Sequence, residues 1–273
     1  MAKKSVREAL RFTADLPDAA DRPIGPKTKK EAADSLAETG AELDDLQERL
    51  YAEHTRAVLL VLQGMDTSGK GGTIRHVVGL VNPQGVHIAS FKKPTPTERR
   101  HHFLWRVRKV LPTAGQLGVF DRSHYEDVLV PKVEGLLTAA EVRTRYREIN
   151  AFEKELADQG VAVVKCFLHI SPEVQKERLL ARLDDPTKLW KYNPHDIDVR
   201  AKFSQYQAAY LAALKNCSAT PWYVVPSDRK WYRNWAVGRL VLETLRDLDP
   251  QYPPAAYDRD AEKARLVDAD PLR

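Results

Sequence analysis

The stretch GMDTSGKGGT, from Gly64 to Thr73, has the residue types of a phosphate-binding loop but departs from the usual pattern at one position. That pattern, G-x-x-x-x-G-K-[ST], places a hydroxyl directly after the lysine, where it helps to hold Mg²⁺ beside a nucleotide. Here Gly71 follows Lys70, so the hydroxyl is missing. Glycines let backbone N–H groups turn toward an anionic oxygen, and the lysine would neutralise phosphate charge. The alternative is a tight turn with a solvated lysine.

Two aspartates are candidates for the missing metal ligand. Asp66 lies inside the loop, where a carboxylate would repel phosphate unless a divalent cation lay between them. Asp121 ends the apolar segment QLGVF, and open α/β sheets bind ligands at the carboxyl edge of their strands. We therefore expect both aspartates to hold Mg²⁺, with Mn²⁺ as an alternative ion and Thr73 as a weaker ligand. The other interpretation of Asp121 is a helix N-cap or an ion pair with Arg122.

A basic stretch, residues 178–200, is the third candidate for chemistry. Arg178 and Arg182 are four residues apart and share a helix face, and Lys188 and Lys191 follow in a proline-punctuated segment. A solvated charged helix is the common explanation of such a run. In P-loop kinases, however, a mobile basic lid closes over the transferring phosphate and excludes water, and we expect that role here.

The elements that must position these residues alternate along the chain. Short apolar segments predict strands at 57–63, 86–91, 116–120, 161–170 and 221–226. Apolar residues at helical spacing predict helices at 31–53, 97–110, 138–158 and 229–247, and a further helix after the loop. Strands that alternate with helices of this length predict a parallel sheet of about five strands, covered by helices on both faces.

Length and composition narrow the setting. The chain has 273 residues, 30% of them charged, with a formal net charge of +5, which suits an acidic ligand without requiring nucleic acid. Its two cysteines, Cys166 and Cys217, are too few for a disulfide framework. The N-terminus has no apolar signal segment and nowhere do eighteen apolar residues run together, so we expect a soluble, cytoplasmic protein. We expect residues 1–30 to form an extended basic arm, residues 31–249 one domain, and residues 250–273 a surface tail.

Several segments together resemble the family-2 polyphosphate kinases, P-loop enzymes that transfer phosphate between inorganic polyphosphate and nucleotides. The matching segments are VLQGMDTSGKGGTIRHV, VNPQGV, SFKKPT, FLWRV, VFDRSHYEDVLV, RLDDPTKLWKYNPHDID and PWYVVPSDRKWYRNWAV. They extend from Leu46 to Leu248. The chain departs from the family at Gly71, where many relatives have an acidic residue, and at His102, where they have Asp.

The resemblance implies a three-layer α/β/α P-loop kinase-like fold with a helical lid. It implies that Asp66 and Asp121 bind Mg²⁺ and that Lys70 and Arg122 contact phosphate. The expected catalytic residues are Asp66, Lys70, Asp121, Arg122 and Arg182. The expected contacts to phosphate or nucleotide are Gly64, Thr67, Ser68, Gly69, Gly71, Gly72, Thr73, Glu126, Arg178, Lys188 and Lys191.

The implied reaction moves a phosphoryl group between polyphosphate and AMP or ADP, giving ADP or ATP, with guanine nucleotides as further candidates. Glu126 and Asp127 resemble the versions that accept monophosphates, including those that take both acceptors. We expect a homo-oligomer, a dimer or a tetramer, that binds neither nucleic acid nor membrane. One rival is an ATP-dependent nucleoside monophosphate kinase of the thymidylate kinase type. A nucleic-acid-binding P-loop protein ranks last, because the lid lacks regularly spaced aromatic residues for base stacking.

Overall fold

Five parallel strands form the central sheet in the computed structural model, which describes residues 5–270 and 272. The strands are β1 (Ala57–Gln63), β2 (Val86–Ser90), β3 (Leu117–Asp121), β4 (Val161–His169) and β5 (Trp222–Pro226). Their order across the sheet is β2-β3-β1-β4-β5, and each neighbouring pair is parallel. The parallel sheet predicted from the alternation of elements is confirmed.

Strand β1 lies at the centre of the sheet, and all seven of its residues are buried. A parallel strand covered on both faces needs apolar side chains at successive positions, and the run AVLLVLQ supplies them. The register places Leu62 beside Asp121 at the end of β3. The segment that follows β1 therefore lies at the same carboxyl edge of the sheet as Asp121.

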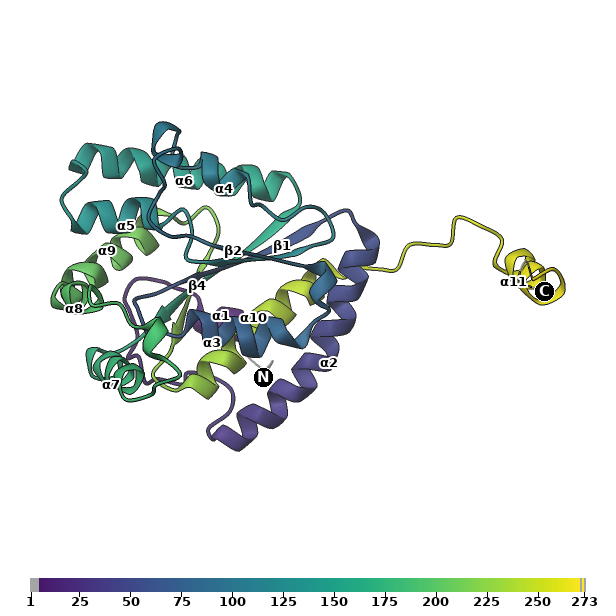
Figure 1. The fold of residues 1–273 in the computed structure, drawn as a ribbon, viewed down its shortest axis with the longest axis horizontal. Coiled ribbons are helices and arrows are strands. Elements are labelled where there is room, and N and C mark those ends of the chain that lie inside the picture. The colour runs from purple at the N-terminus through teal and green to yellow at the C-terminus, as the bar shows by residue number, and fades with distance from the viewer. Residues whose placement is uncertain (1–4, 271, 273) are drawn as a thin grey trace.

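Helices cover both faces of the sheet (Figure 1). One layer contains α1 (Val6–Leu10), α2 (Lys29–Glu53), α3 (Lys70–Val77) and α10 (Lys230–Leu248). The other contains α4 (Trp105–Arg108), α5 (Glu126–Val133), α6 (Ala139–Asp158) and α9 (Phe203–Asn216). Helices α7 (Pro172–Leu183) and α8 (Asp196–Ala201) lie at the carboxyl edge of the sheet. Helix α11 (Arg259–Asp268) comes after α10 in the chain. Short 3₁₀ helices are η1 (Val78–Leu80), η2 (Pro83–Gly85), η3 (Glu98–Arg100) and η4 (Leu189–Lys191). The three-layer α/β/α architecture is confirmed.

Local sequence accounts for the ends of the long helices. The Thr28 side chain accepts a hydrogen bond from the backbone N–H of Glu31 at the start of α2. Thr138 and Glu141 form a reciprocal capping box at the start of α6. These helices and α10 begin and end within two residues of the predicted bounds.

Two expectations about local structure were wrong. The helix predicted over 97–110 is split into η3 and α4, because His101 between them has an extended backbone. Residues 6–10, expected to be extended, form α1, whose Val6 is buried and whose first N–H groups donate to Glu243 on α10. Figure 1 shows α11 at the end of an extended segment, away from the sheet. Across residues 5–270, none of the helices combines the length and the apolar character needed to span a membrane.

Candidate functional site

The glycine loop, residues 64–69, connects β1 to α3 at the carboxyl edge of the sheet. Three residues in it have left-handed backbone angles: Gly64 with φ of 153°, Thr67 with φ of 66° and Gly69 with φ of 107°. Lys70 begins α3 and is buried, and its Nζ donates to the carbonyl oxygens of Gly64 (2.7 Å) and Met65 (3.4 Å). The strand–loop–helix order that a phosphate-binding loop requires is present.

Charged side chains from β3 and α5 meet this loop. Arg122 Nη2 donates to Asp66 Oδ1 at 2.7 Å, and Arg122 Nε lies 3.8 Å from Glu126 Oε2. Arg122 reaches the loop from a left-handed backbone conformation, with φ of 64°, directly after Asp121. The charges that act on Lys70 are Arg122 and the carboxylates of Asp66, Asp121 and Glu126. The structure therefore brings five of the predicted residues into one cluster.

Burial and neighbouring charges shift the pKa values of the residues in this cluster. Burial alone would raise the pKa of Asp66, but the positive charges of Lys70, Arg122 and Arg182 outweigh it and lower that pKa. Burial lowers the pKa of Lys70, and Arg122 adds to this effect. Burial also raises the pKa of Glu126. Asp66 is thus held as a carboxylate beside two cations.

The oxygen donors of the cluster fit a divalent ion. Carboxylate oxygens are the ligands that Mg²⁺ prefers, and Mg²⁺ typically keeps several waters and binds substrate phosphates besides one or two carboxylates. Within residues 5–270, no three His, Cys, Asp or Glu side chains are grouped closely enough to hold an ion by themselves. Asp66 and Asp121 would therefore supply part of a coordination shell, and Arg122 would have to release Asp66. Thr73, expected as a weaker ligand, is fully buried.

The glycines of the predicted site differ in what surrounds them. A Cβ on Gly69 would lie 1.7 Å from Arg233 Nη1, and one on Gly72 would lie 2.9 Å from Arg233 Nη2. A Cβ on Gly71 would meet no heavy atom within 4 Å, and Gly71 is helical. The position that lacks the usual hydroxyl is therefore open, whereas its neighbours are not.

The four basic residues expected in a lid are divided by the structure. Arg178 is buried, and its guanidinium donates to backbone carbonyls of the glycine loop, so the alternative of a solvated charged helix does not hold for it. Arg182 Nη1 donates to the carbonyl of Lys191 (3.2 Å) and lies 3.4 Å from Asp196 Oδ2. Lys188 pairs with Asp185 within the same segment. The remaining three basic residues thus stay near the surface, on or after the end of α7.

Arg233 on α10 was not among the residues predicted from the sequence. It is buried, and its Nη1 donates to the carbonyl of Ser68 at 3.2 Å. The signal available in the sequence was its place in the segment PSDRKWYRNWAV, which carries part of the family resemblance.

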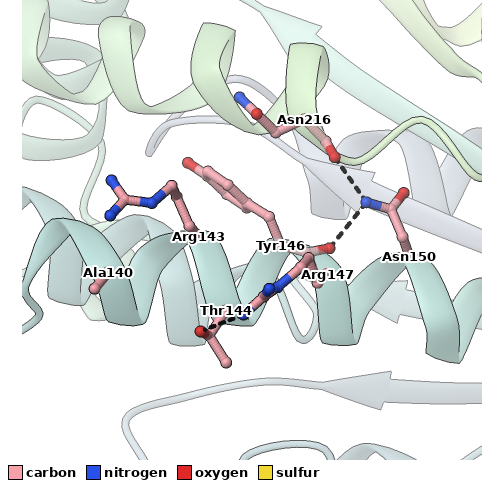
Figure 2. A pocket seen from close by; sticks show the side chains of 7 residues that line it. All are labelled: Ala140, Arg143, Thr144, Tyr146, Arg147, Asn150 and Asn216. Atoms are coloured by element: carbon pink, nitrogen blue, oxygen red, sulfur yellow. Dashed lines mark hydrogen bonds between the residues drawn. The ribbon is translucent and has the colours of Figure 1, made fainter.

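A separate hollow of about 410 Å³ lies between α6 and α9 (Figure 2). Its lining residues are Ala140, Arg143, Thr144, Tyr146, Arg147, Asn150 and Asn216. Asn150 Nδ2 already donates to the carbonyls of Tyr146 and Asn216, which joins the two helices. The hollow shares no residue with the cluster at the glycine loop, and we assign it no part in the reaction.

Residues 27–253 match the family model described as Polyphosphate kinase 2. This chain belongs to the polyphosphate kinase 2 family. Among the polyphosphate kinase 2 relatives, an AMP/ADP-polyphosphate phosphotransferase of Meiothermus ruber is 46% identical over 93% of this chain and 96% of its own length. An ADP-polyphosphate phosphotransferase of Rhodopseudomonas palustris is 40% identical over 87% of each chain.

A solved structure agrees with this membership. The crystal structure of polyphosphate kinase 2 from Arthrobacter aurescens matches 97% of this chain and 98% of its own chain, with a TM-score of 0.92 and 44% identity. The P-loop kinase-like fold expected from the resemblance is thereby confirmed.

Proposed function

We propose that this chain transfers a phosphoryl group between inorganic polyphosphate and AMP or ADP. The observation that carries this proposal is the cluster of Asp66, Lys70, Asp121 and Arg122 at the glycine loop, in a chain of the polyphosphate kinase 2 family. The named relatives act on polyphosphate and on AMP, ADP or both, and they favour this donor over ATP. The rival assignment to an ATP-dependent monophosphate kinase is not favoured.

The chemistry asked of the protein is positioning and charge neutralisation. The acceptor is already an anionic phosphate oxygen, so the transfer needs no strong general base. N–H groups of the glycine loop and the start of α3 would orient the reacting phosphates. Lys70 and Arg122 would neutralise the negative charge on them. Arg182, Lys188 and Lys191 would close over the donor chain and exclude water.

The remaining assignments are proposals of finer detail. Kinases of this family typically need a divalent metal ion, and we propose Mg²⁺ held by Asp66 and Asp121, where it would neutralise charge between the two polyanions. The Meiothermus relative supports acceptance of both AMP and ADP. We also propose a homo-oligomer that works in the cytoplasm, where its nucleotide substrates are found.

The decisive test mixes purified protein with Mg²⁺, polyphosphate and either AMP or ADP, and follows nucleotide products by chromatography. We expect ADP and ATP to form. ATP with a panel of nucleoside monophosphates is the matched control. Product in the control alone would establish the monophosphate kinase instead.

A further inference from the structure

Arg178 reaches the glycine loop from α7. Its Nη1 lies 2.9 Å from the carbonyl oxygen of Thr67 and 3.4 Å from that of Ser68. Its Nη2 donates to the carbonyls of Ser227 (2.7 Å) and Asp228 (2.9 Å) after β5. One guanidinium therefore ties the loop to the end of β5, and all its acceptors are backbone oxygens.

Arg233 reaches the same loop from α10. Its Nη1 donates to the Ser68 carbonyl at 3.2 Å, while its Nε and Nη2 donate to Asn234 Oδ1 at 3.2 and 2.8 Å. The Asn234 amide thus orients the guanidinium. Because a Cβ at position 69 would lie 1.7 Å from Arg233 Nη1, this approach is possible only beside Gly69.

The backbone of the loop explains why carbonyls face these arginines. Thr67 and Gly69, on either side of Ser68, both have left-handed backbone angles. Alternation of left-handed and right-handed residues directs successive N–H groups toward one side of a loop, where they can bind an anion. The carbonyls of Thr67 and Ser68 then need hydrogen-bond donors elsewhere, and Arg178 and Arg233 supply them.

Both arginines are buried, and burying a charged guanidinium costs desolvation free energy. Among residues 5–270 and 272, neither guanidinium lies within ion-pair distance of a carboxylate. Burial, with the nearby charge of Arg178, lowers the pKa of Arg233 to about 9. A buried charge without a counter-charge destabilises the fold, and the charge of an anion bound in the loop would offset that cost.

We propose that Arg178 and Arg233 are positioning residues for phosphoryl transfer, whose guanidinium groups hold the carbonyls of Thr67 and Ser68 outward. The Ser68 N–H donates within the loop to the Met65 carbonyl at 3.1 Å, and the other loop N–H groups then stay directed at the bound phosphate. Arg178 belongs to α7, whose last turn carries the lid residue Arg182. Its hydrogen bonds therefore also connect the helix that carries the lid to the glycine loop. The inference rests on the proposed function for its catalytic consequence, but the loop geometry can be tested without it.

The test compares Arg178→Lys and Arg233→Lys with Arg246→Lys, a control on the exposed end of α10 that pairs with Glu42. Lysine keeps the charge but lacks the planar fork that holds two carbonyls. Hydrogen exchange of the amides of residues 65–70 should be about tenfold to a hundredfold faster in the two test variants, as expected for loss of a charged hydrogen bond. Exchange in β1 and β4 should not change.

Kinetics supply the second readout. We expect kcat to fall by about the same factor, and KM to rise for nucleotide and polyphosphate alike, because both phosphates depend on the loop. The slope of log KM for polyphosphate against log salt concentration should stay that of the wild type, because neither arginine contacts the donor. Asn234→Ala, which disturbs only the orientation of Arg233, should give a smaller change in the same direction.

Three results would overturn the proposal. Unchanged loop exchange with a higher KM for polyphosphate alone and a shallower salt slope would make these arginines direct donor contacts. A lower melting temperature with unchanged kinetics per folded molecule would make them purely structural. Unchanged loop exchange and kinetics in Asn234→Ala would show that the orientation of Arg233 is irrelevant, which keeps the proposal testable if the lysine variants do not fold. If wild-type protein shows no transfer from polyphosphate, the proposed function fails, whereas the exchange experiment still judges the loop geometry.

Discussion

Two ionic clusters of the protein, one around Lys165 and Glu153 and one at the glycine loop, differ in how fully their charges are paired. Lys165 on β4 and Glu153 on α6 are both fully buried, with Nζ and Oε2 2.6 Å apart. Tyr125 and Thr220 donate further hydrogen bonds to Glu153 (2.7 and 2.9 Å). Lys165 also donates to the carbonyl of Cys217 at 2.9 Å. Such a network joins two layers of the fold, and the charges of Lys165 and Glu153 satisfy each other within it.

The cluster at the glycine loop is different, because it is open. The Asp66 and Arg122 side chains are 25% and 35% exposed, and Lys70 donates only to backbone carbonyls. The buried Ser68 hydroxyl has no hydrogen-bond partner within the described part of the chain. Charges that are not fully paired are available to a charged substrate. The Lys165–Glu153 cluster thus stabilises the fold, whereas the cluster at the glycine loop is arranged for ligands.

The largest effect should come from the aspartates of the open cluster. Asp66→Asn and Asp121→Asn each remove a charge that faces the proposed metal ion, so we expect kcat to fall about a thousandfold or more. The melting temperature should change little, because neither side chain is part of the core. The measurement is turnover over a Mg²⁺ titration, with Asp247→Asn, an exposed residue paired with Arg7, as control. Near-normal turnover of Asp66→Asn at low Mg²⁺ would refute its role.

Changes in the Lys165–Glu153 cluster, called the closed cluster below, should alter the stability of the fold more than the activity. Lys165→Met leaves Glu153 buried without its counter-charge, and we expect the free energy of unfolding to fall by about 3–5 kcal/mol. Activity per folded molecule should stay near that of the wild type. The double variant Lys165→Met with Glu153→Leu should recover much of the loss, as measured by urea denaturation. A single variant as stable as the wild type would show that the pair is not needed.

Acid should weaken the closed cluster. Burial would raise the pKa of Glu153, but Lys165 and His124 outweigh it and lower it from its usual 4.5 to about 2. Because the folded pKa is the lower one, this carboxylate stabilises the fold above pH 4.5 and loses that contribution as the pH falls toward 2. The loss should be about 3 kcal/mol. Denaturation between pH 5 and pH 2.5 measures it, and Glu153→Gln should show a flatter pH dependence over that range.

The lid should affect turnover more than stability. Arg182 lies near the surface at the end of α7, and Arg182→Ala should lower kcat by about tenfold to a hundredfold, because a closing residue acts on the transition state. Its melting temperature should barely move, since surface changes typically cost within about half a kcal/mol. Parallel thermal melts and steady-state kinetics decide this. A destabilised variant with full activity per folded molecule would assign Arg182 to the fold instead.

The smallest effect is expected at Gly71. Gly71→Ser restores the hydroxyl of the usual loop, and we predict unchanged or slightly reduced activity, within about twofold. A serine fits at this position, because Gly71 is helical and a Cβ there would meet no heavy atom within 4 Å. The expectation now rests on Asp66 and Asp121 as metal ligands. A clear gain with a lower Mg²⁺ requirement would contradict it.

The sequence by itself determined the elements whose causes are local. Three features depend only on residues near them in sequence and could be predicted: the apolar run of β1, the caps of α2 and α6, and the glycines after β1. The alternation of these elements was enough to predict a parallel sheet. It also predicted that the loop and Asp121 would meet at one edge, because parallel strands end together.

Only the tertiary structure decided which charged residues are buried and against what. The spacing of Arg178 and Arg182 fits a solvated helix face, yet Arg178 bonds to Thr67, 111 residues away in sequence, and Arg233 bonds to Ser68 across 165 residues. Arg106, in the helix expected over 97–110, likewise pairs with Asp127 on α5. A charged residue on a helix has the same local pattern whether it faces water or a buried carbonyl. The partner that distinguishes the two comes from a distant part of the chain, and only folding brings it there.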